Sequence, residues 1–134
     1  AETGRGSLAL VQGVMREAAP DVIIAVDALA AASPEHLFRT VQLTDAGIVP
    51  GSGVGNSRAE FSRDTLGVPV VAVGVPTVVD ARSLFPSEDA PGGLLVTRTD
   101  ADARVRELGR LVGYACDLAL HRGISLGEIP TYLA

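Results

Sequence analysis

Two short runs of apolar, mostly β-branched residues constrain the fold of this chain most strongly. They read "VIIAV" at residues 22–26 and "VPVVAVGVP" at residues 68–76. Continuous apolar runs of this length, bounded by turn residues, are typical of strands buried on both faces of a sheet. Helical patterns precede the first run and follow the second. This alternation predicts an α/β fold of three layers, with a largely parallel or mixed sheet that carries helices on both faces.

The first helical pattern covers residues 8–19, where Ser7 can cap the helix and Pro20 ends it. The sequence "SPE" at residues 33–35 is a second cap signal, because proline fits the first position of a helix. It predicts a brief helix over residues 34–38. The apolar residues of the first pattern fall on one helical face: Leu8, Val11, Val14, Met15 and Ala18.

The longest helical pattern covers residues 100–123 and ends at a glycine, and a last short helix can follow over residues 125–132. Between the two apolar runs, alternation predicts a half-buried strand over residues 40–43 and then a short helix that ends at Gly67. After the second run, "PTVVDARSLF" at residues 76–85 predicts a loop or a helical turn. The apolar face of the longest pattern comprises Val105, Leu108, Leu111, Val112, Ala115, Leu118 and Ala119.

The composition favours one globular domain over residues 1–134, because 47% of the residues are hydrophobic and 20% are charged. A net charge of −5 argues against nucleic-acid binding, which needs a basic face. No apolar run approaches the ~18 residues needed to cross a bilayer, and no secretory signal opens the chain. We therefore expect a cytoplasmic location and no membrane partner. The lone Cys116 is expected to be a small buried hydrophobe.

The stretch "PGSGVGNSR" at residues 50–58 raises the question of a nucleotide site. A dinucleotide-binding fingerprint reads G-x-G-x-x-G, but Asn56 stands where the third glycine belongs. A P-loop needs a lysine followed by serine or threonine, and no such pair follows. The loop is then either a turn whose glycines accept positive φ or a substrate-facing loop that another backbone can approach closely. Its candidate substrate-contacting residues are Gly51, Ser52, Gly53, Gly55 and Asn56.

Three aspartates follow predicted strands. Asp27 comes directly after the first apolar run, at the expected carboxyl end of a strand, where parallel α/β sheets bind ligands. Asp80 follows "VPTVV" in a similar setting, and Asp45 lies at an expected turn. A carboxylate at such a place costs free energy unless it is hydrogen-bonded, and two that meet can act as general acid and base. Asp27 can equally cap the turn that follows, so the sequence leaves open which carboxylates meet.

The sequence does not support a metal site or a serine triad. His36 and His121 lie far apart, and neither has a neighbour at ligand spacing, so no metal is expected. Ser52 and Ser57 lack the G-x-S-x-G context of a nucleophilic serine. No cofactor is expected from these residues.

Four stretches of the chain resemble the germination proteases of spore-forming bacteria. Together they touch most of the chain, and the second and third are the most specific. They are "PDVIIAVDALAA" (20–31), "QLTDAGIVPGSGVGNSR" (42–58), "LGVPVVAVGVPTVVDA" (66–81) and, more weakly, "LLVT" to "LALH" (94–121).

The resemblance implies an endopeptidase that degrades small acid-soluble spore proteins during germination, in the cytoplasm of the spore core. It implies an atypical aspartic-type mechanism in which Asp27 takes the place of one catalytic aspartate. It also implies a phosphorylase/hydrolase-like fold similar to that of hydrogenase-maturation proteases, a zymogen that processes itself, and a homo-oligomer. The glycine loop would then form part of the rim of a protease active site.

The chain also departs from the family that it resembles. Family members are much longer, and the resemblance puts the second aspartate of the pair before "TGRGS", upstream of this sequence. Within the sequence, Asp80 and Asp45 are the candidates for a second acid. We therefore expect a fragment of a longer protease chain. The alternatives are a non-catalytic relative that binds peptides and an enzyme that binds a nucleotide or small molecule through the glycine loop.

Overall fold

The structure is a computed structural model that describes residues 3–51, 59–85 and 93–128. The chain divides into two compact units, Ala1–Arg98 and Thr99–Ala134, and each is described by itself. Whether residues 1–134 form a single domain stays a prediction. The helices, 3-10 helices (η) and strands are α1 (Thr3–Ala18), β1 (Ile23–Ala31), η1 (Pro34–His36), β2 (Gln42–Thr44), α2 (Arg63–Leu66), β3 (Val70–Asp80), η3 (Ala81–Ser83), β4 (Leu95–Val96) and α3 (Ala101–Leu120).

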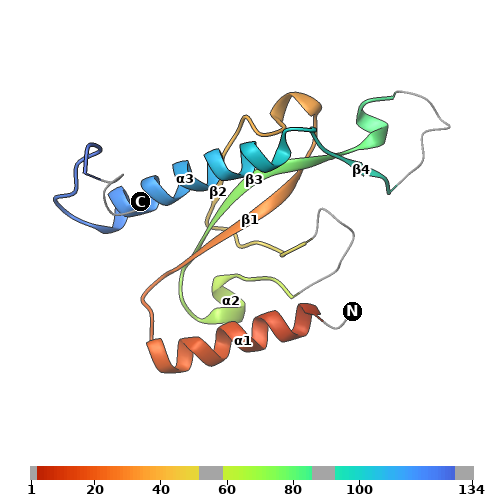
Figure 1. The fold of residues 1–134 in the computed structure, drawn as a ribbon. Helices are drawn as coiled ribbons and strands as arrows, with labels where there is room; N and C mark the ends of the chain where they lie inside the picture. Colours follow the sequence, from red (N-terminus) through yellow and green to blue (C-terminus); the bar gives the residue numbers. More distant parts are fainter. Residues whose placement is uncertain (1–2, 52–58, 86–92, 129–134) are drawn as a thin grey trace. The chain divides into compact units, whose positions relative to one another are not determined.

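The first unit contains a mixed sheet built around the long strand β3 (Figure 1). β1 runs parallel to β3, whereas β2 and β4 both pair with β3 in the antiparallel direction. The predicted α/β class with a largely parallel or mixed sheet is therefore confirmed at this level, as a mixed sheet in which the long β1–β3 pair is parallel and the two short pairs are antiparallel. For β2 to run parallel to β1, the chain would need a crossover connection of a dozen or more residues between them. Only residues 32–41 separate the two strands, so β2 runs in the opposite direction.

The core of this unit follows β3. Its residues from Val70 to Pro76 are almost all buried, and Val70, Pro76 and Val79 are the largest fully buried side chains. This agrees with the continuous apolar run from which a buried strand was predicted. In contrast, β2 is exposed along its whole length, so the prediction of a half-buried strand there is wrong.

β1 is longer than the sequence predicted, which changes the position of Asp27. The strand was expected to end at Val26, with Asp27 just after it, but β1 continues to Ala31. Asp27 therefore lies in the middle of the strand, opposite Gly74 of β3. The "ALAA" segment has little strand preference of its own. It is extended because β3 continues beside it and pairs with it as far as Val79.

β3 also continues past its predicted end. Pro76 was expected to begin a loop, but the strand runs through it to Asp80, and only Ala81–Ser83 form the predicted helical turn. The pairing register jumps from Leu29↔Pro76 to Ala30↔Val78, so Thr77 is an extra residue in β3. Proline is tolerated in sheets at such a bulge, because the ladder is already interrupted there.

Helix α1 begins earlier than predicted, so Ser7 lies inside the helix and is not its cap. Its end is as expected: Ala19 adopts a left-handed φ of 43° just before Pro20. The predicted apolar face is only partly correct. Leu8, Val11 and Met15 are partly buried, but Val14 is 59% exposed.

The short helical turns follow their cap signals. Ser33 caps η1, since its hydroxyl accepts a hydrogen bond from the Glu35 N–H at 3.4 Å. The turn ends at His36, two residues before the predicted end at residue 38, because Leu37 and Phe38 leave the helix and are buried. α2 ends at Gly67, whose φ of 77° confirms the predicted glycine stop.

The second unit contains α3, the longest helix, as predicted. It ends at Leu120 with His121 as its cap, a little before the predicted glycine stop. Of the predicted apolar face only Val112 is buried, and Cys116, expected to be buried, is a free and partly exposed thiol. Ser125 begins a turn rather than a helix within residues 121–128, and residues 129–132 lie outside the described part. No helix in the described ranges is long and apolar enough to cross a membrane.

Candidate functional site

The carboxylate of Asp27 is held by backbone N–H groups at both of its oxygens. Oδ1 accepts a hydrogen bond from the Ala28 N–H at 2.9 Å, and Oδ2 accepts one from the Gly51 N–H at 3.4 Å. The side chain is partly buried. Asp27 thus does more than cap a local turn, because it joins the middle of β1 to a segment 24 residues further along the chain.

The contact with Gly51 brings the start of the glycine loop to Asp27. Gly51 has a φ of 72°, so at this position the expectation of positive φ is met. An antiparallel bridge between Ile48 and Phe61 closes the base of the loop, with N–H to C=O distances of 3.0 and 2.7 Å. The remaining candidate residues lie outside the described residues, and their approach to Asp27 stays a prediction: Ser52, Gly53, Gly55 and Asn56.

Gly74 and Leu29 belong to the surroundings of Asp27, although sequence reasoning gave them no role. Gly74 pairs with Asp27 across the β1–β3 ladder. The side chain of Leu29 fills the space beside Gly74, where a Cβ atom would lie 2.7 Å from Leu29 Cγ. A glycine inside a run of β-branched residues was the available signal, since it marks a close approach of other groups.

Asp80 lies too far from Asp27 to form an acid pair with it. Asp27 is opposite Gly74, and Asp80 is six residues further along β3, which corresponds to about 20 Å at ~3.3 Å per residue. Its carboxylate instead binds Arg82: Oδ1 accepts from Nε at 3.0 Å, and Oδ2 from a guanidinium NH2 at 2.8 Å. These side-chain bonds, followed by one from the Arg82 backbone N–H, lower the pKa of Asp80 to about 2.

Asp45 is also separated from Asp27. It follows β2, and β2 and β1 pair with opposite edges of β3. Two strand spacings of ~4.8 Å therefore put at least about 10 Å of sheet between the two backbones. Asp45 is exposed, in a turn where the Thr44 hydroxyl accepts a hydrogen bond from the Ala46 N–H. Neither Asp80 nor Asp45, the two candidates within this chain for a second acid, therefore lies close to Asp27.

Replacing Arg82 with glutamine should return the pKa of Asp80 from about 2 toward its ordinary value of 3.8. The reason is that the hydrogen bonds from the Arg82 guanidinium have the largest effect on the pKa of this partly exposed carboxylate. Because the folded-state pKa is depressed, the linked stabilisation is present above about pH 4 and is lost as the pH falls toward 2. An NMR titration of the Asp80 carboxyl carbon measures this shift. Arg39→Gln, at another exposed arginine, should leave the Asp80 curve unchanged, and an equal curve in both variants would contradict the assignment.

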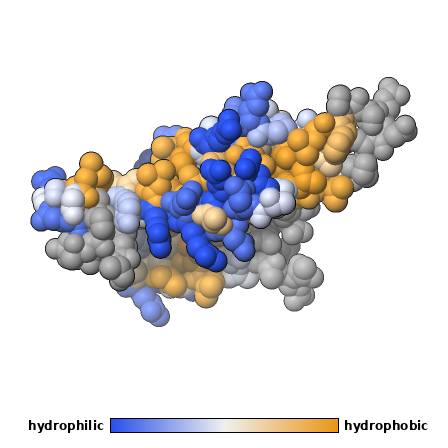
Figure 2. Space-filling model, turned by 45° about the horizontal axis from the view of Figure 1, so that its top comes forward, coloured by the Kyte–Doolittle hydropathy of each residue, from blue (hydrophilic) through white to orange (hydrophobic). Residues whose placement is uncertain are grey.

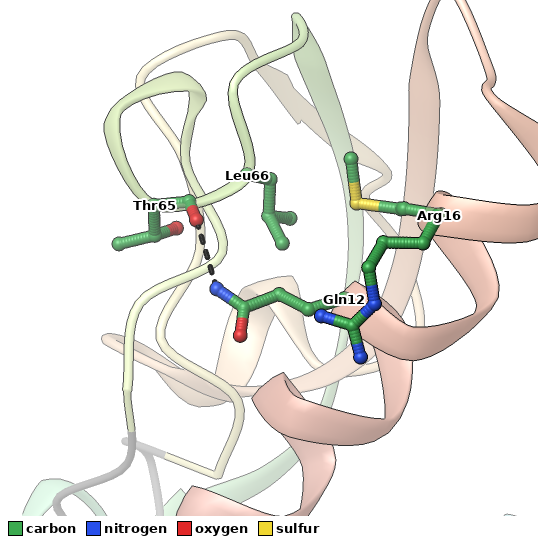
Figure 3. A pocket seen from close by; sticks show the side chains of 5 residues that line it. Gln12, Arg16, Thr65 and Leu66 are labelled. Carbon is green, nitrogen blue, oxygen red and sulfur yellow. Dashed lines mark hydrogen bonds between the residues drawn. The ribbon is translucent and has the colours of Figure 1, made fainter.

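A separate pocket of about 430 Å³ lies between α1 and α2 (Figure 3). Across it, Gln12 Nε2 donates a hydrogen bond to the Thr65 carbonyl at 3.2 Å. None of the predicted site residues lines this pocket, so it does not support the site at Asp27. It is lined by Gln12, Met15, Arg16, Thr65 and Leu66.

The two histidines are not brought into a metal-binding cluster. Within residues 3–51, 59–85 and 93–128, no group of three or more His, Cys, Asp and Glu side chains is arranged to hold an ion. The Nδ1 atom of His121, the residue that caps the end of α3, lies 3.8 Å from Asp117 Oδ1, in the usual i, i+4 spacing of a helical pair.

The chain is similar to known germination proteases over much of its length. It is 58% identical over 79 residues to the germination protease of Bacillus velezensis and 56% identical over 79 residues to that of Bacillus subtilis. With the germination protease of Bacillus cereus it shares 55% identity over 82 residues. These matches cover 59%, 59% and 61% of this chain but 22% of each relative. The chain therefore spans about a fifth of the length of the curated relatives that it matches.

The model of one protein family, described as germination protease, matches residues 2–90. That range contains the whole of α1, the strand that carries Asp27, the glycine loop and the strand that carries Gly74. The match therefore includes all the parts that meet at Asp27, and it extends over 89 of the 134 residues. Because the family model matches more than half of the chain, the chain belongs to the germination protease family.

Proposed function

We propose that the full-length protein is an endopeptidase that degrades small acid-soluble spore proteins during germination. Membership of the germination protease family supports a peptidase. The observation that carries the proposal is the position of Asp27, a partly buried carboxylate held between Ala28 on β1 and Gly51 at the start of the glycine loop. The two N–H donors fix the orientation of the carboxylate, and a general base has to be held within hydrogen-bond reach of the proton that it takes.

The proposed mechanism is of the atypical aspartic type. The Asp27 carboxylate takes a proton from a water molecule, and the resulting hydroxide attacks the carbonyl carbon of the scissile peptide bond. A second carboxyl group, in its acid form, protonates the carbonyl oxygen. The long separations of Asp80 and Asp45 from Asp27 argue against either of them as this second acid, which in the proposal comes from the upstream segment that the family resemblance implies. The tetrahedral intermediate then collapses: the C–N bond breaks, the protonated Asp27 gives its proton to the leaving nitrogen, and the second carboxylate takes back the proton of the former carbonyl oxygen, so both carboxyl groups return to their starting states.

The glycine loop has a substrate-binding role in this proposal. Gly51 carries no side chain, so a substrate backbone can approach Asp27 from the side of the loop. Asn56 would donate its side-chain amide to the carbonyl oxygen on which negative charge develops. Gly53 and Gly55 would leave room for the extended peptide, and Ser52 would offer it a hydroxyl group.

Further properties of the full-length protein follow from its family. We infer a fold like that of hydrogenase-maturation proteases, a zymogen that processes itself, a homo-oligomer, and a location in the cytoplasm of the spore core. The mixed α/β sheet supports the fold inference at the level of class.

The proposal is tested with the full-length protein and a purified small acid-soluble spore protein. We expect internal cleavage, detected by mass spectrometry, and we expect it to survive a metal chelator as well as serine- and cysteine-directed reagents. An aspartic-type mechanism uses an activated water and no protein nucleophile, which is why these reagents should have no effect. Inhibition by any of them would contradict the mechanism. Binding of the spore protein without cleavage would instead identify a non-catalytic peptide-binding relative.

A further inference from the structure

The pocket between α1 and α2 brings a charged group, an amide and two apolar side chains around one space (Figure 3). Both helices belong to the first compact unit, so one part of the chain holds all the walls of the pocket. Its volume of about 430 Å³ falls within the ~300–1,000 Å³ of pockets that hold small ligands. The groups that line it therefore define the kind of ligand that it fits.

Arg16 brings a positive charge to this pocket. Its guanidinium forms neither an ion pair nor a hydrogen bond with any residue that the structure describes. A Cβ atom added at Gly13 would lie 3.9 Å from a guanidinium nitrogen of Arg16. The side chain therefore turns back along α1, toward Gln12 in the preceding turn (Figure 3). Its planar fork of N–H donors is left for an oxyanion of a ligand.

A carboxylate matches this charge better than a phosphate group does. A guanidinium binds a carboxylate through two parallel N–H···O hydrogen bonds, with one charge against one. A phosphate group carries about 1.5–2 negative charges at pH 7, and Arg16 is the only basic residue among the described residues that line the pocket. Arg16 also lies in the last turn of α1, where the negative end of the helix dipole disfavours additional anionic charge.

Gln12 offers a hydrogen-bond acceptor beside this cation. Its Nε2 donates to the Thr65 carbonyl at 3.2 Å, which fixes the end of the amide that carries the nitrogen. Oε1 is the other end, and it accepts no hydrogen bond from a described residue. The Thr65 hydroxyl is already used, because it donates to the Glu60 carbonyl at 2.8 Å and accepts from the Ser62 N–H at 3.0 Å. The ligand that fits this pocket therefore has an N–H donor next to its carboxylate.

Met15 and Leu66 supply the apolar walls of the pocket. Leu66 is 7% exposed, and Met15 is partly buried. Apolar side chains are exposed at several other places on the surface, part of which Figure 2 shows. Such residues alone do not identify a ligand. In the pocket they stand beside a cation and an amide acceptor, so they fit an apolar group that is attached to the carboxylate.

The last residue of a peptide carries all three groups: a free carboxylate, its own amide N–H and a side chain. We propose that this pocket binds the C-terminal residue of a peptide that ends in an apolar side chain. Arg16 holds its carboxylate, and Gln12 Oε1 accepts its N–H. Its side chain packs against Met15 and Leu66. A peptidase makes such a terminus at each bond that it cleaves. This source of the ligand rests on the proposed function, whereas the recognition itself does not.

N-acetyl-leucine tests the proposal, because it carries the carboxylate, the N–H and the apolar side chain together. It is titrated into the full-length protein labelled with ¹³C at the methionine methyl groups, and the Met15 signal is assigned through Met15→Leu. We expect a saturable shift of this signal with a Kd on the order of 1 mM, as suits so small a ligand. N-acetyl-leucinamide has no charge and should bind at least about 10-fold more weakly, and hexanoate has no N–H and should bind about 3–10-fold more weakly. Absence of a saturable shift, or equal binding of N-acetyl-leucinamide, would overturn the proposal. Equal binding of hexanoate would overturn it as well, in favour of a site for free small acids.

Arg16→Gln tests the role of the charge. Arg16 is exposed, so the variant should melt as the parent protein does, while its affinity for N-acetyl-leucine should fall at least about 10-fold. Arg63→Gln is the matched control, because Arg63 is an exposed arginine of α2 that does not line the pocket, and it should bind as the parent protein does. Unchanged binding by Arg16→Gln, or equal losses in both variants, would show that Arg16 does not hold the carboxylate. Because no readout involves cleavage, failure of this site is distinct from failure of the proposed protease activity.

Discussion

Asp27→Asn in the full-length protein should lower the rate of spore-protein cleavage by about 10²–10⁴-fold, the range that a general acid or base contributes. An asparagine oxygen can still accept the Ala28 N–H, so β1 should keep its local geometry. The amide group cannot accept a proton from water, and it can no longer accept the 3.4 Å bond from Gly51 through its nitrogen. Loss of that single bond should cost about 0.5–1.5 kcal/mol, so the variant should still be folded. Steady-state cleavage rates and thermal melting of the same preparations measure the two effects.

Asp80→Asn and Asp45→Asn are the matched controls for this substitution. Both remove an exposed or partly exposed carboxylate of the same sheet, but neither carboxylate lies near Asp27. We expect cleavage rates within a few-fold of the parent protein for both. If either control lost as much activity as Asp27→Asn, the second acid would lie inside this chain. If Asp27→Asn cleaved at the parent rate, Asp27 would have no catalytic role.

The local signals in this sequence predicted the short elements well. Ser33 before Pro34 and the glycine at position 67 both act within one turn, and the structure confirms the cap and the stop. Such signals need only the steric preferences of a few neighbouring residues. The α/β class was also predictable, because apolar runs and helical patterns alternate along the chain.

The lengths of the two long strands could not be predicted from local sequence. The local sequence predicts that one strand ends before Asp27 and that the other ends at Pro76. Each strand continues because the other lies beside it, and the bulge at Thr77 accommodates the proline. Pairing between residues about 50 positions apart is a tertiary effect, and it overrides weak local preferences.

The candidate site could be predicted only in part, because it too depends on contacts between distant parts of the chain. The sequence pointed to Asp27 and to the glycine loop separately, and the contact between Asp27 and Gly51 joins them. The sequence could not show that Asp80 lies far along β3 from Asp27, because both aspartates follow an apolar stretch that reads as a strand. Only the register, which pairs Asp27 with Gly74, separates the two aspartates.

Gly74 offers a direct test of that register. The residue is buried in the central strand, and Leu29 reaches across from β1 into the space that a side chain would occupy. Leu29 is two residues from Asp27, so both side chains extend from the same face of β1. A group that displaces Leu29 or separates β1 from β3 at this level therefore also moves the carboxylate. The position of the Asp27 carboxylate therefore depends on a glycine, which has no side chain, at position 74.

Gly74→Ala should destabilise the full-length protein by about 1–3 kcal/mol, as overpacking of a core does, and should reduce cleavage as well. The new Cβ would lie 2.7 Å from Leu29 Cγ, closer than any normal contact, and it stands on a central strand that cannot easily shift.

The double variant Gly74→Ala/Leu29→Ala removes the obstructing side chain, so its loss should be smaller than the sum of the losses of Gly74→Ala and Leu29→Ala, with a coupling of about 0.5–3 kcal/mol. Gly109→Ala in α3 is the matched control. A Cβ there meets no atom within 4 Å, and alanine favours a helix, so melting should be unchanged or higher. Thermal melting and cleavage rates are measured for the parent protein, Gly74→Ala, Leu29→Ala, the double variant and Gly109→Ala. Equal melting of Gly74→Ala and the parent protein, or losses of the two single variants that simply add in the double variant, would show that Leu29 does not pack over Gly74 as the structure describes.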